Sequence, residues 1–208
     1  MTRPTAIFYA GTNGAGKSSF RERVESQNVE IVIDSDQIAK ALHPDNPREK
    51  DMSAGKLAIQ RFNTAIVERR SFSMETTLTG RSAIRRIREA KQADFQVELR
   101  YIGLDNVELN IQRVEERVAK GGHWIDPDLI RKRYIESFSN LLKAVEFTDL
   151  TEIYDNTQSA HQLCLTIEQR QILALSKQLP NWVNTVCKQL QALEYKVYFT
   201  DDLQADTH

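Results

Sequence analysis

The chain contains the sequence Gly11-Thr12-Asn13-Gly14-Ala15-Gly16-Lys17-Ser18, which matches the Walker A pattern GxxxxGKS at every defined position. A short apolar run at residues 5–10 precedes this sequence, and a helical pattern continues from Lys17 to about Ser26. A buried strand, a glycine-rich turn and a helix in succession form the setting in which this pattern binds nucleotide phosphates. The stretch therefore predicts a P-loop.

The residues of this loop suit separate chemical tasks. Glycines let the backbone N–H groups point at phosphate oxygens, at the positive end of the following helix. Lys17 can reach the β- and γ-phosphates and take part in catalysis, and the Ser18 hydroxyl can be a ligand of Mg²⁺. We expect nucleotide to be bound by the loop and the residue after it: Gly11, Thr12, Asn13, Gly14, Ala15, Gly16, Lys17, Ser18 and Ser19.

Strand-like and helical patterns alternate along most of the chain. Runs of apolar or β-branched residues after the first strand predict further strands at 30–34, 71–77, 95–104 and 152–154. This alternation predicts an α/β protein of the P-loop NTPase fold. We expect a mostly parallel sheet of five or more strands, with helices on both faces and a helical lid.

The segment 157–208 is less regular than the part before it. Residues 163–175 can form a hairpin, and a helix is expected near 180–193. No repeat, low-complexity stretch or linker divides the chain. We therefore expect a single kinase-like domain over 1–208, with its core at 5–156 and the remainder as a C-terminal extension.

The second predicted strand ends in the acidic sequence Asp34-Ser35-Asp36. Ligands of a doubly wound sheet bind at the carboxyl ends of its strands, where the P-loop also lies. Asp36 is therefore a candidate for the catalytic base that orients an acceptor hydroxyl and takes its proton. With Ser18 it is also a candidate Mg²⁺ ligand. Asp34 or Ser35 can instead cap the helix that is expected from Gln37 onward.

The third predicted strand ends at the same edge in Glu75-Thr76-Thr77. A carboxylate beside two hydroxyls can fix an acceptor hydroxyl, or hold Mg²⁺ through water. The alternative is a cap or turn without contact to substrate. Together with Asp36, these three residues are our candidates for the acceptor site.

Residues 112–133 have the pattern of two helices joined by a glycine hinge at 121–124. The second helix has clear start signals, because Asp126 can be its N-cap and Pro127 suits its first position. We expect the pair to form the lid.

Arginines flank this hinge on both sides. Arg113 and Arg117 lie one turn apart on the first helix, and Arg131 and Arg133 lie on the second. A lid that closes such arginines over a triphosphate would neutralise the charge that develops during transfer. Arg113, Arg117 and Arg133 are our catalytic candidates, and the alternative for each is a solvated surface arginine.

A further helix is predicted at residues 81–91. It has two isoleucines on one side and Arg81, Arg85 and Arg88 on another. One amphipathic surface helix explains this pattern, so we interpret the arginines as a solvated basic face and not as a polyanion-binding patch.

Composition limits the partners of the protein. The formal net charge is −1 and the pI about 6.4, so no global positive field exists to hold nucleic acid or an anionic membrane surface. No signal-peptide region and no apolar run of membrane-spanning length occurs. Cys164 and Cys187 lack the spacing of a metal site or a disulfide framework. We expect a cytoplasmic protein.

With the P-loop, Asp34-Ser35-Asp36, Glu75-Thr76 and the arginine-bearing segment in this order, the sequence resembles the zeta toxin family between about residues 5 and 156. That family comprises P-loop kinases of bacterial toxin–antitoxin systems and their relatives. Known members phosphorylate UDP-N-acetylglucosamine, so the resemblance implies a nucleotide sugar as acceptor and an antitoxin as candidate partner. The resemblance also implies the roles of the residues. Lys17 and Ser18 bind nucleotide and Mg²⁺, Asp36 is the base, Glu75 and Thr76 bind the acceptor, and Arg113 stabilises phosphate.

The chain departs from the family pattern at two places. The typical toxin has Glu-Gly-Thr where this chain has Glu75-Thr76-Thr77, and the sequence 121–124 replaces its second arginine segment. In these respects the chain is more similar to the shorter zeta-like predicted ATPases or kinases.

The function expected from the sequence is phosphoryl transfer from ATP, with Mg²⁺, to an alcohol group of a small soluble acceptor. The choice of ATP over GTP depends on the resemblance and on the lack of an NKxD guanine motif. One alternative is an ATPase that acts as a nucleotide-dependent switch without a small-molecule acceptor. Another is a module that binds nucleotide without turnover.

Overall fold

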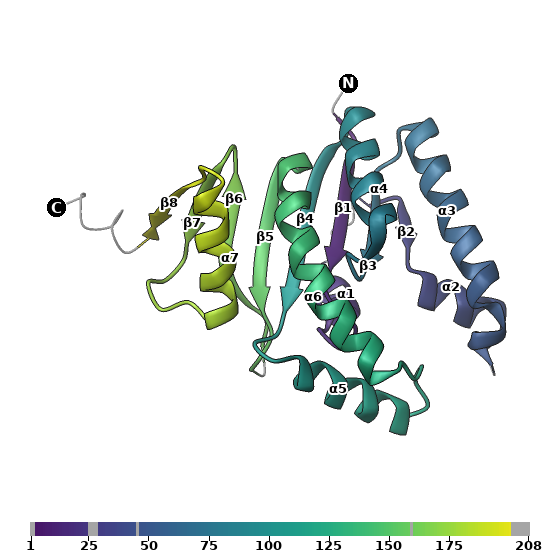
Figure 1. Cartoon of the computed structure of the whole chain (residues 1–208). Coiled ribbons are helices and arrows are strands. Elements are labelled where there is room, and N and C mark those ends of the chain that lie inside the picture. Colours follow the sequence, from purple (N-terminus) through teal and green to yellow (C-terminus); the bar gives the residue numbers. More distant parts are fainter. Residues whose placement is uncertain (1–2, 25–28, 45, 159, 201–208) are drawn as a thin grey trace.

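The computed structural model describes the chain except for residues 1–2, 25–28, 45, 159 and 201–208. Within the described part, one eight-stranded sheet has the order β2-β3-β1-β4-β5-β6-β7-β8 (Figure 1). The strands are β1 Thr5–Ala10, β2 Ile31–Ile33, β3 Phe72–Thr76, β4 Gln96–Gly103, β5 Leu150–Asp155, β6 Gln162–Glu168, β7 Gln171–Ala174 and β8 Lys196–Phe199. The α-helices are α1 Lys17–Val24, α2 Ser35–Leu42, α3 Asp51–Glu68, α4 Gly80–Gln92, α5 Val107–Ala119, α6 Pro127–Ala144 and α7 Asn181–Ala192. Two short 3₁₀ helices, Pro47–Lys50 and Val145–Phe147, precede α3 and follow α6. The end of the first expected helix, at Ser26, lies outside the described residues.

The five strands expected between residues 5 and 156 are all present. They pair in parallel as β2-β3-β1-β4-β5, so the carboxyl ends of these strands lie at one edge. The expected hairpin is also present as β6 and β7, which are antiparallel to each other, and β6 is antiparallel to β5. The sheet is thus mixed, though still mostly parallel. Strand β8, which the sequence did not predict, pairs in parallel with β7.

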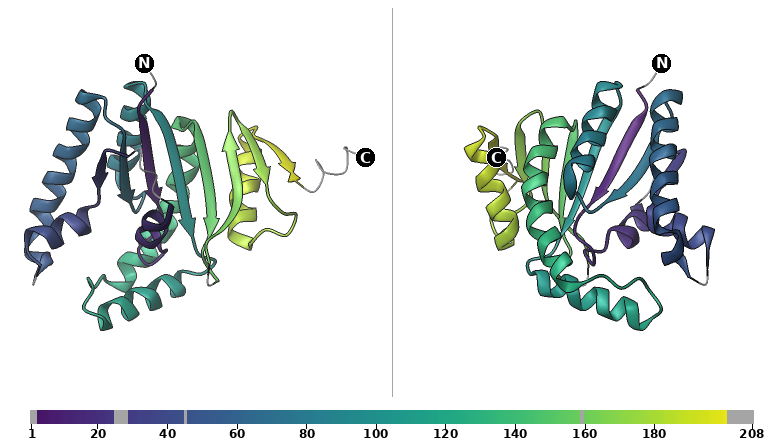
Figure 2. Two further views of the ribbon diagram at one scale, coloured as in Figure 1. Left: turned by 180° about the vertical axis from the view of Figure 1, so that it is seen from behind. Right: turned by 45° about the vertical axis from the view of Figure 1, so that its right-hand side comes forward.

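Side chains of β1 alternate between two helical layers. Ala6, Phe8 and Ala10 face the larger core, which includes residues of α2, α3, α4, α6 and α7, whereas Ile7 and Tyr9 pack with Phe20 of α1. Helix α1 lies on the opposite side of the sheet from α4, α6 and α7 (Figure 2). Helices therefore cover both faces as expected, but unequally: within the described residues, no helix lies over β5 to β7 on the α1 side.

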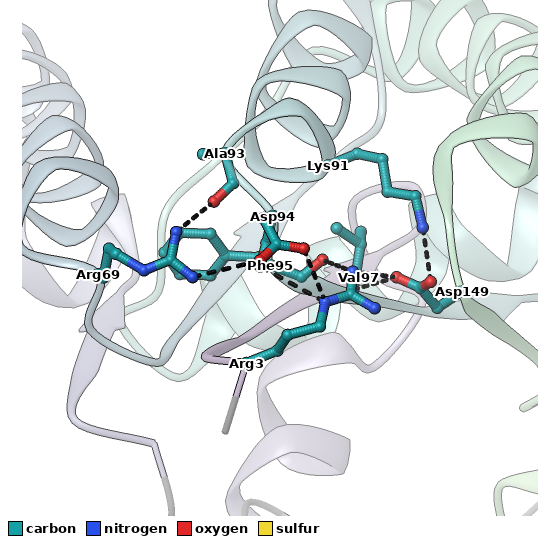
Figure 3. A network of polar contacts seen from close by, with 8 residues as sticks. All are labelled: Arg3, Arg69, Lys91, Ala93, Asp94, Phe95, Val97 and Asp149. Atoms are coloured by element: carbon teal, nitrogen blue, oxygen red, sulfur yellow. Dashed lines mark hydrogen bonds and ion pairs between the residues drawn. The ribbon is translucent and has the colours of Figure 1, made fainter. Parts of the chain in front are cut away.

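A polar network connects the segments at the edge of the sheet where β1, β4 and β5 begin (Figure 3). Arg3 pairs with Asp94 at 3.1 Å and with Asp149 at 3.6 Å. Asp149 also accepts hydrogen bonds from Lys91 Nζ at 2.5 Å and from Val97 N at 2.8 Å. Burial acts to raise the pKa of Asp149, but these donors outweigh it and lower the pKa. The network fixes the amino ends of the strands and leaves their carboxyl ends free for a ligand.

The C-terminal extension packs on the same core as the rest of the sheet. Trp182 of α7 lies against Gly103, where an added Cβ would be 2.5 Å from the indole ring. The indole N–H donates to Asp155 Oδ1 at 2.7 Å. No helix among the described residues has the length and apolarity that crossing a membrane requires.

Candidate active site

The loop after β1 has the backbone shape of a P-loop. Gly11 and Gly14 have φ values of 142° and 79°, in the region that favours glycine. A Cβ at Gly11 would lie 2.1 Å from Ile102 O, and one at Gly14 would lie 2.3 Å from Asn110 O. The loop can therefore pack against β4 and α5 only because these positions lack a side chain.

Two buried asparagines from elsewhere in the chain hold this loop. Asn110 Nδ2 of α5 donates to Asn13 O at 2.8 Å, and Asn156 Nδ2 donates to Ala15 O at 2.8 Å. Both are less than a tenth exposed. Neither residue was predicted from the sequence, although Asn156 directly follows β5 at the ligand-binding edge and this position is a signal that could have identified it.

Lys17 lies at the start of α1 and lines a cleft of about 830 Å³ at the carboxyl edge of the sheet. Its ammonium donates to Thr12 O at 3.2 Å. Burial lowers the pKa of Lys17, while the nearby carboxylates of Glu75 and Asp36 oppose this shift and Arg117 adds to it. The P-loop lysine, both acidic strand ends and a lid arginine are thus close enough to interact electrostatically.

The two aspartates after β2 have different surroundings. Asp34 is buried, and its Oδ1 accepts from Asp36 N at 3.0 Å and from Gln37 N at 3.1 Å. It is the N-cap of α2, as the alternative role proposed for it required. The side chain of Asp36 is exposed and lines the cleft. Asp36 can therefore meet a ligand, whereas Asp34 is occupied by the fold.

Glu75 is tied to the P-loop helix. It accepts from Ser18 Oγ at 2.9 Å and from Arg21 Nε at 2.8 Å, and Arg21 also pairs with Asp34 at 3.0 Å. Burial and the charge of Asp34 raise the pKa of Glu75, which Lys17 and Arg21 partly counteract. Arg21 thus bridges the acidic ends of β2 and β3, a role that the sequence analysis did not assign.

The other residues after β3 also line the cleft. Thr76 and Thr77 do so, although both have local partners as well. Thr76 Oγ1 accepts from Leu78 N at 3.0 Å, and Thr77 shares a hydrogen bond of 2.8 Å with Thr79. Residues 76–79 therefore form the local turn contacts considered as the alternative, and Thr76 and Thr77 line the cleft as well.

The lid consists of α5 and α6, and Asp126 and Pro127 start α6 as expected. Asp126 Oδ1 accepts from Asp128 N and Leu129 N, and Pro127 occupies the first turn. Ile125 and Ile130 belong to the small hydrophobic cluster that joins α5 to α6. The lid therefore has a core of its own, next to the cleft.

Three of the four arginines in the lid line the cleft. Arg113 donates to Asn156 O at 2.9 Å, Arg117 to His123 O at 2.8 Å and Arg133 to Asn13 Oδ1 at 2.9 Å. Arg131 instead pairs on the surface with Glu108 and Asp128. The solvated alternative therefore holds for Arg131, and the three candidates face the P-loop and its surroundings.

Not every predicted loop residue meets the cleft. Asn13, Gly14, Gly16, Lys17, Ser18 and Ser19 line it. Gly11, Thr12 and Ala15 are buried behind them and form the framework of the loop. The lining also contains residues to which the sequence analysis gave no role: Glu22, Met74, Thr79, Ser82, Ala83, Arg86 and Asn156.

The donor set at this edge is suitable for Mg²⁺, which prefers oxygen ligands and often keeps several waters or phosphate oxygens. Ser18 Oγ and the carboxylates of Asp36 and Glu75 supply such oxygens around one cleft. Among the described residues no group of three or more His, Cys, Asp or Glu side chains forms a ready-made metal cage. The site therefore fits a metal ion that arrives with nucleotide.

A P-loop at the carboxyl edge of a parallel sheet, with a helical lid, defines the P-loop kinase class of fold. The Zeta toxin family matches residues 1–170, and the chain belongs to this family. A Haemophilus influenzae (strain ATCC 51907 / DSM 11121 / KW20 / Rd) protein described as uncharacterized is 49% identical over 129 residues, which cover 62% of this chain and 91% of the relative.

Two solved structures have a similar fold. A chain of the native AvrRxo1-ORF1:-ORF2 complex has a TM-score of 0.66 at 11% identity, covering 89% of this chain and 63% of that one. This chain thus spans less than two thirds of that neighbour. A chain of the PezAT toxin–antitoxin system of Streptococcus pneumoniae has a TM-score of 0.55 at 15% identity, covering 92% of this chain and 85% of that one. At such identities the likeness establishes the fold alone.

Proposed function

We propose that this protein is a kinase that transfers the γ-phosphoryl group of ATP to a hydroxyl of a small soluble acceptor. The observation that carries the proposal is the meeting of Lys17, Asp36 and Glu75 in one cleft. A phosphate-binding cation and a free carboxylate at one strand edge are what transfer to a hydroxyl requires. Membership of the Zeta toxin family supports the same reading.

Asp36 is the residue we assign to the proton transfer. The acceptor O–H bond breaks as its oxygen bonds to the γ-phosphorus, and the proton passes to the Asp36 carboxylate. The bond between the γ-phosphorus and the bridging oxygen breaks, which leaves ADP. Asp36 suits this step because its side chain is exposed to the cleft, whereas Asp34 is buried against Arg21.

Lys17 and the lid arginines would stabilise the charge on the phosphoryl oxygens. Arg113, Arg117 and Arg133 line the cleft, and within the described part of the chain they donate only to neutral oxygen atoms. Such weak partners can be exchanged for phosphate, since charge-assisted hydrogen bonds are stronger than neutral ones. Ser18 and Asp36 would hold Mg²⁺, which offsets phosphate charge when bound.

Glu75, Thr76 and Thr77 are the residues we assign to the acceptor. UDP-N-acetylglucosamine is a candidate by family membership, and the Glu75-Thr76-Thr77 sequence is the feature that would alter its fit. An antitoxin is a candidate partner, since the neighbours with a similar fold include a toxin–antitoxin system. ATP as the nucleotide agrees with the AvrRxo1-ORF1:-ORF2 complex, which has been determined with ATP. The single-domain organisation and the cytoplasmic location stay predictions.

The test is transfer of label from γ-³²P-ATP with Mg²⁺ to a panel of nucleotide sugars, nucleosides and amino sugars. Asp36→Asn should lower transfer by about 10²-fold or more, a typical general-base contribution, and keep nucleotide affinity within a few fold. Lys17→Ala should abolish productive nucleotide binding. Asp51→Asn, an exposed aspartate outside the cleft, is the matched control and should be fully active.

The outcomes separate the kinase from the other functions considered. A labelled small product that depends on Asp36 supports the kinase. Release of inorganic phosphate with no labelled acceptor supports an ATPase switch, and binding without turnover supports a nucleotide-binding module.

A further inference from the structure

Helix α4 contributes one face to the cleft. Its lining residues, with the residue just before it, follow the three- and four-residue spacing of one helical face: Thr79, Ser82, Ala83 and Arg86. Arg86 is half-buried, whereas its neighbour Arg85 is exposed. The basic helix therefore has two kinds of arginine. Those expected to be solvated lie outside the cleft lining, and Arg86, which the sequence pattern did not single out, lines the cleft.

Arg86 has no counterion in the described part of the chain. No hydrogen bond or ion pair connects its guanidinium to another described residue. Burial and repulsion from Arg85 lower its pKa, and the attraction of Glu89 offsets only part of this. Half-burying a guanidinium without a partner costs solvation free energy, which a bound anion would recover.

The other cations of the cleft are in a different situation. Lys17 donates to Thr12 O, and the three lid arginines of the lining, Arg113, Arg117 and Arg133, each donate to an oxygen atom of the protein. Within the described lining, Arg86 is the cation without such a partner. Its guanidinium also forms a planar fork, which matches the oxygens of phosphate or carboxylate groups.

The position of Arg86 indicates which substrate it meets. Helix α4 begins just after β3, whose end carries Glu75 and Thr76. The wall formed by the end of β3 and by α4 thus combines these residues with Arg86. The P-loop and the lid line other parts of the same cleft, where Arg133 donates to Asn13 Oδ1. Nucleotide phosphates belong to the P-loop, and Arg86 lies on the helix that follows the proposed acceptor residues, so its position favours contact with the acceptor.

We propose that Arg86 is a specificity-determining residue that binds an anionic group of the phosphoryl acceptor, so that the preferred acceptor carries a phosphate or carboxylate besides its reacting hydroxyl. That the anion belongs to a phosphoryl acceptor rests on the proposed function, whereas binding of an anion by Arg86 does not. It excludes neutral sugars and neutral nucleosides as preferred substrates.

The experiment compares Arg86→Gln with Arg85→Gln, which removes the same charge from an exposed position of the same helix. The acceptors are pairs that differ in charge: a sugar phosphate, a sugar acid and the uncharged parent sugar, together with UDP-N-acetylglucosamine. Transfer of labelled phosphate is measured first. Binding of the same compounds to protein saturated with a non-hydrolysable ATP analogue is then measured by calorimetry.

For anionic acceptors, Arg86→Gln should raise both the KM of transfer and the dissociation constant measured by calorimetry by about 10- to 100-fold, because it removes a charge-assisted hydrogen bond. The KM for ATP should not change, and Arg85→Gln should behave as wild type. The sugar phosphate and the sugar acid reveal which anionic group is preferred. Arg86→Gln should also be at least as thermally stable as wild type, because the substitution removes a half-buried cation without a partner.

The inference would be overturned if wild type and Arg86→Gln bound every anionic compound with equal affinity. It would also be overturned if the protein bound only the uncharged sugars, or bound none of the compounds. A loss of thermal stability in Arg86→Gln would also count against it. If transfer fails in wild type but Arg86-dependent anion binding is seen, the anion site stands and the proposed kinase function is refuted.

Discussion

Replacing Arg21 with methionine tests the ion cluster that joins the P-loop helix to the ends of β2 and β3. Arg21 is 3% exposed and bonds Asp34 at 3.0 Å and Glu75 at 2.8 Å. The carboxylate side chains are only 6% and 10% exposed. Methionine keeps most of the length of the side chain and removes the charge, so two buried carboxylates lose their shared cation.

The size of the effect follows from this geometry. Removing one partner of a buried ion pair costs about 3–5 kcal/mol, because the remaining charge is left without compensation. Arg21→Met should therefore lower the free energy of unfolding by about 3–5 kcal/mol at pH 8, a large part of the 5–15 kcal/mol typical of a protein. Arg70→Met is the control, since Arg70 pairs with Glu30 on the surface, and it should change stability little.

The effect should depend on pH in a defined direction. The pKa of Glu75 is already raised by burial and by Asp34, and loss of Arg21 raises it further. A carboxyl group whose pKa is higher in the folded than in the unfolded state lowers the free energy of unfolding as pH rises. This loss develops between the pKa of the unfolded state and that of the folded state. The destabilisation by Arg21→Met should thus be smaller at pH 5 than at pH 8.

Urea unfolding followed by circular dichroism at both pH values measures this. Glu75→Gln in the Arg21→Met background should recover part of the loss, because only one uncompensated carboxylate then remains. A loss below about 1 kcal/mol, the range of exposed pairs, would refute the reasoning. So would a loss that is the same at pH 5 and pH 8.

Two further predictions concern regions away from the cleft. Asp149→Asn should cost about 1–3 kcal/mol at pH 7, because Asp149 accepts charge-assisted hydrogen bonds, and should leave ATP affinity unchanged. The pKa of Asp149 is lowered in the folded state, so its carboxylate stabilises the protein above the unfolded-state pKa, and this stabilisation is lost as pH falls through the folded-state pKa. Urea unfolding that shows the same loss of stability at pH 7 and at pH 3 would contradict this. Gly103→Ala should cost about 1–3 kcal/mol, because the added methyl meets the Trp182 ring. In a protein that already carries Trp182→Leu, Gly103→Ala should cost less stability, as thermal unfolding can measure. If the effects of the two substitutions simply add, the contact between residue 103 and the Trp182 ring does not limit stability.

Several features of the site were accessible from the sequence because they depend on neighbouring residues. The glycines and Lys17 of the P-loop are specified by local backbone geometry. The ends of parallel strands must gather at one edge, so Asp36 and Glu75 could be placed near the loop before any contact was known. The start of α6 at Asp126 and Pro127 follows from capping chemistry, which is also local.

Other features depend on contacts between distant parts of the chain. Arg133 reaches Asn13 across 120 positions, whereas Arg131, two residues earlier, pairs on the surface. Which of two such arginines faces the cleft depends on how the helix is rotated about its axis, and packing of the core decides this rotation. Arg86 differs from Arg85 for the same reason.

By itself, the sequence determined a P-loop, five parallel strands and the acidic ends of two of them, since each depends on local periodicity or turn chemistry. Only the tertiary structure decided that Arg21 joins these acidic ends, that Asn110 and Asn156 hold the loop, and that β8 extends the sheet. These features require side chains or strands from separate segments to meet. No pattern within one segment specifies such a meeting, because it depends on how all the layers pack together.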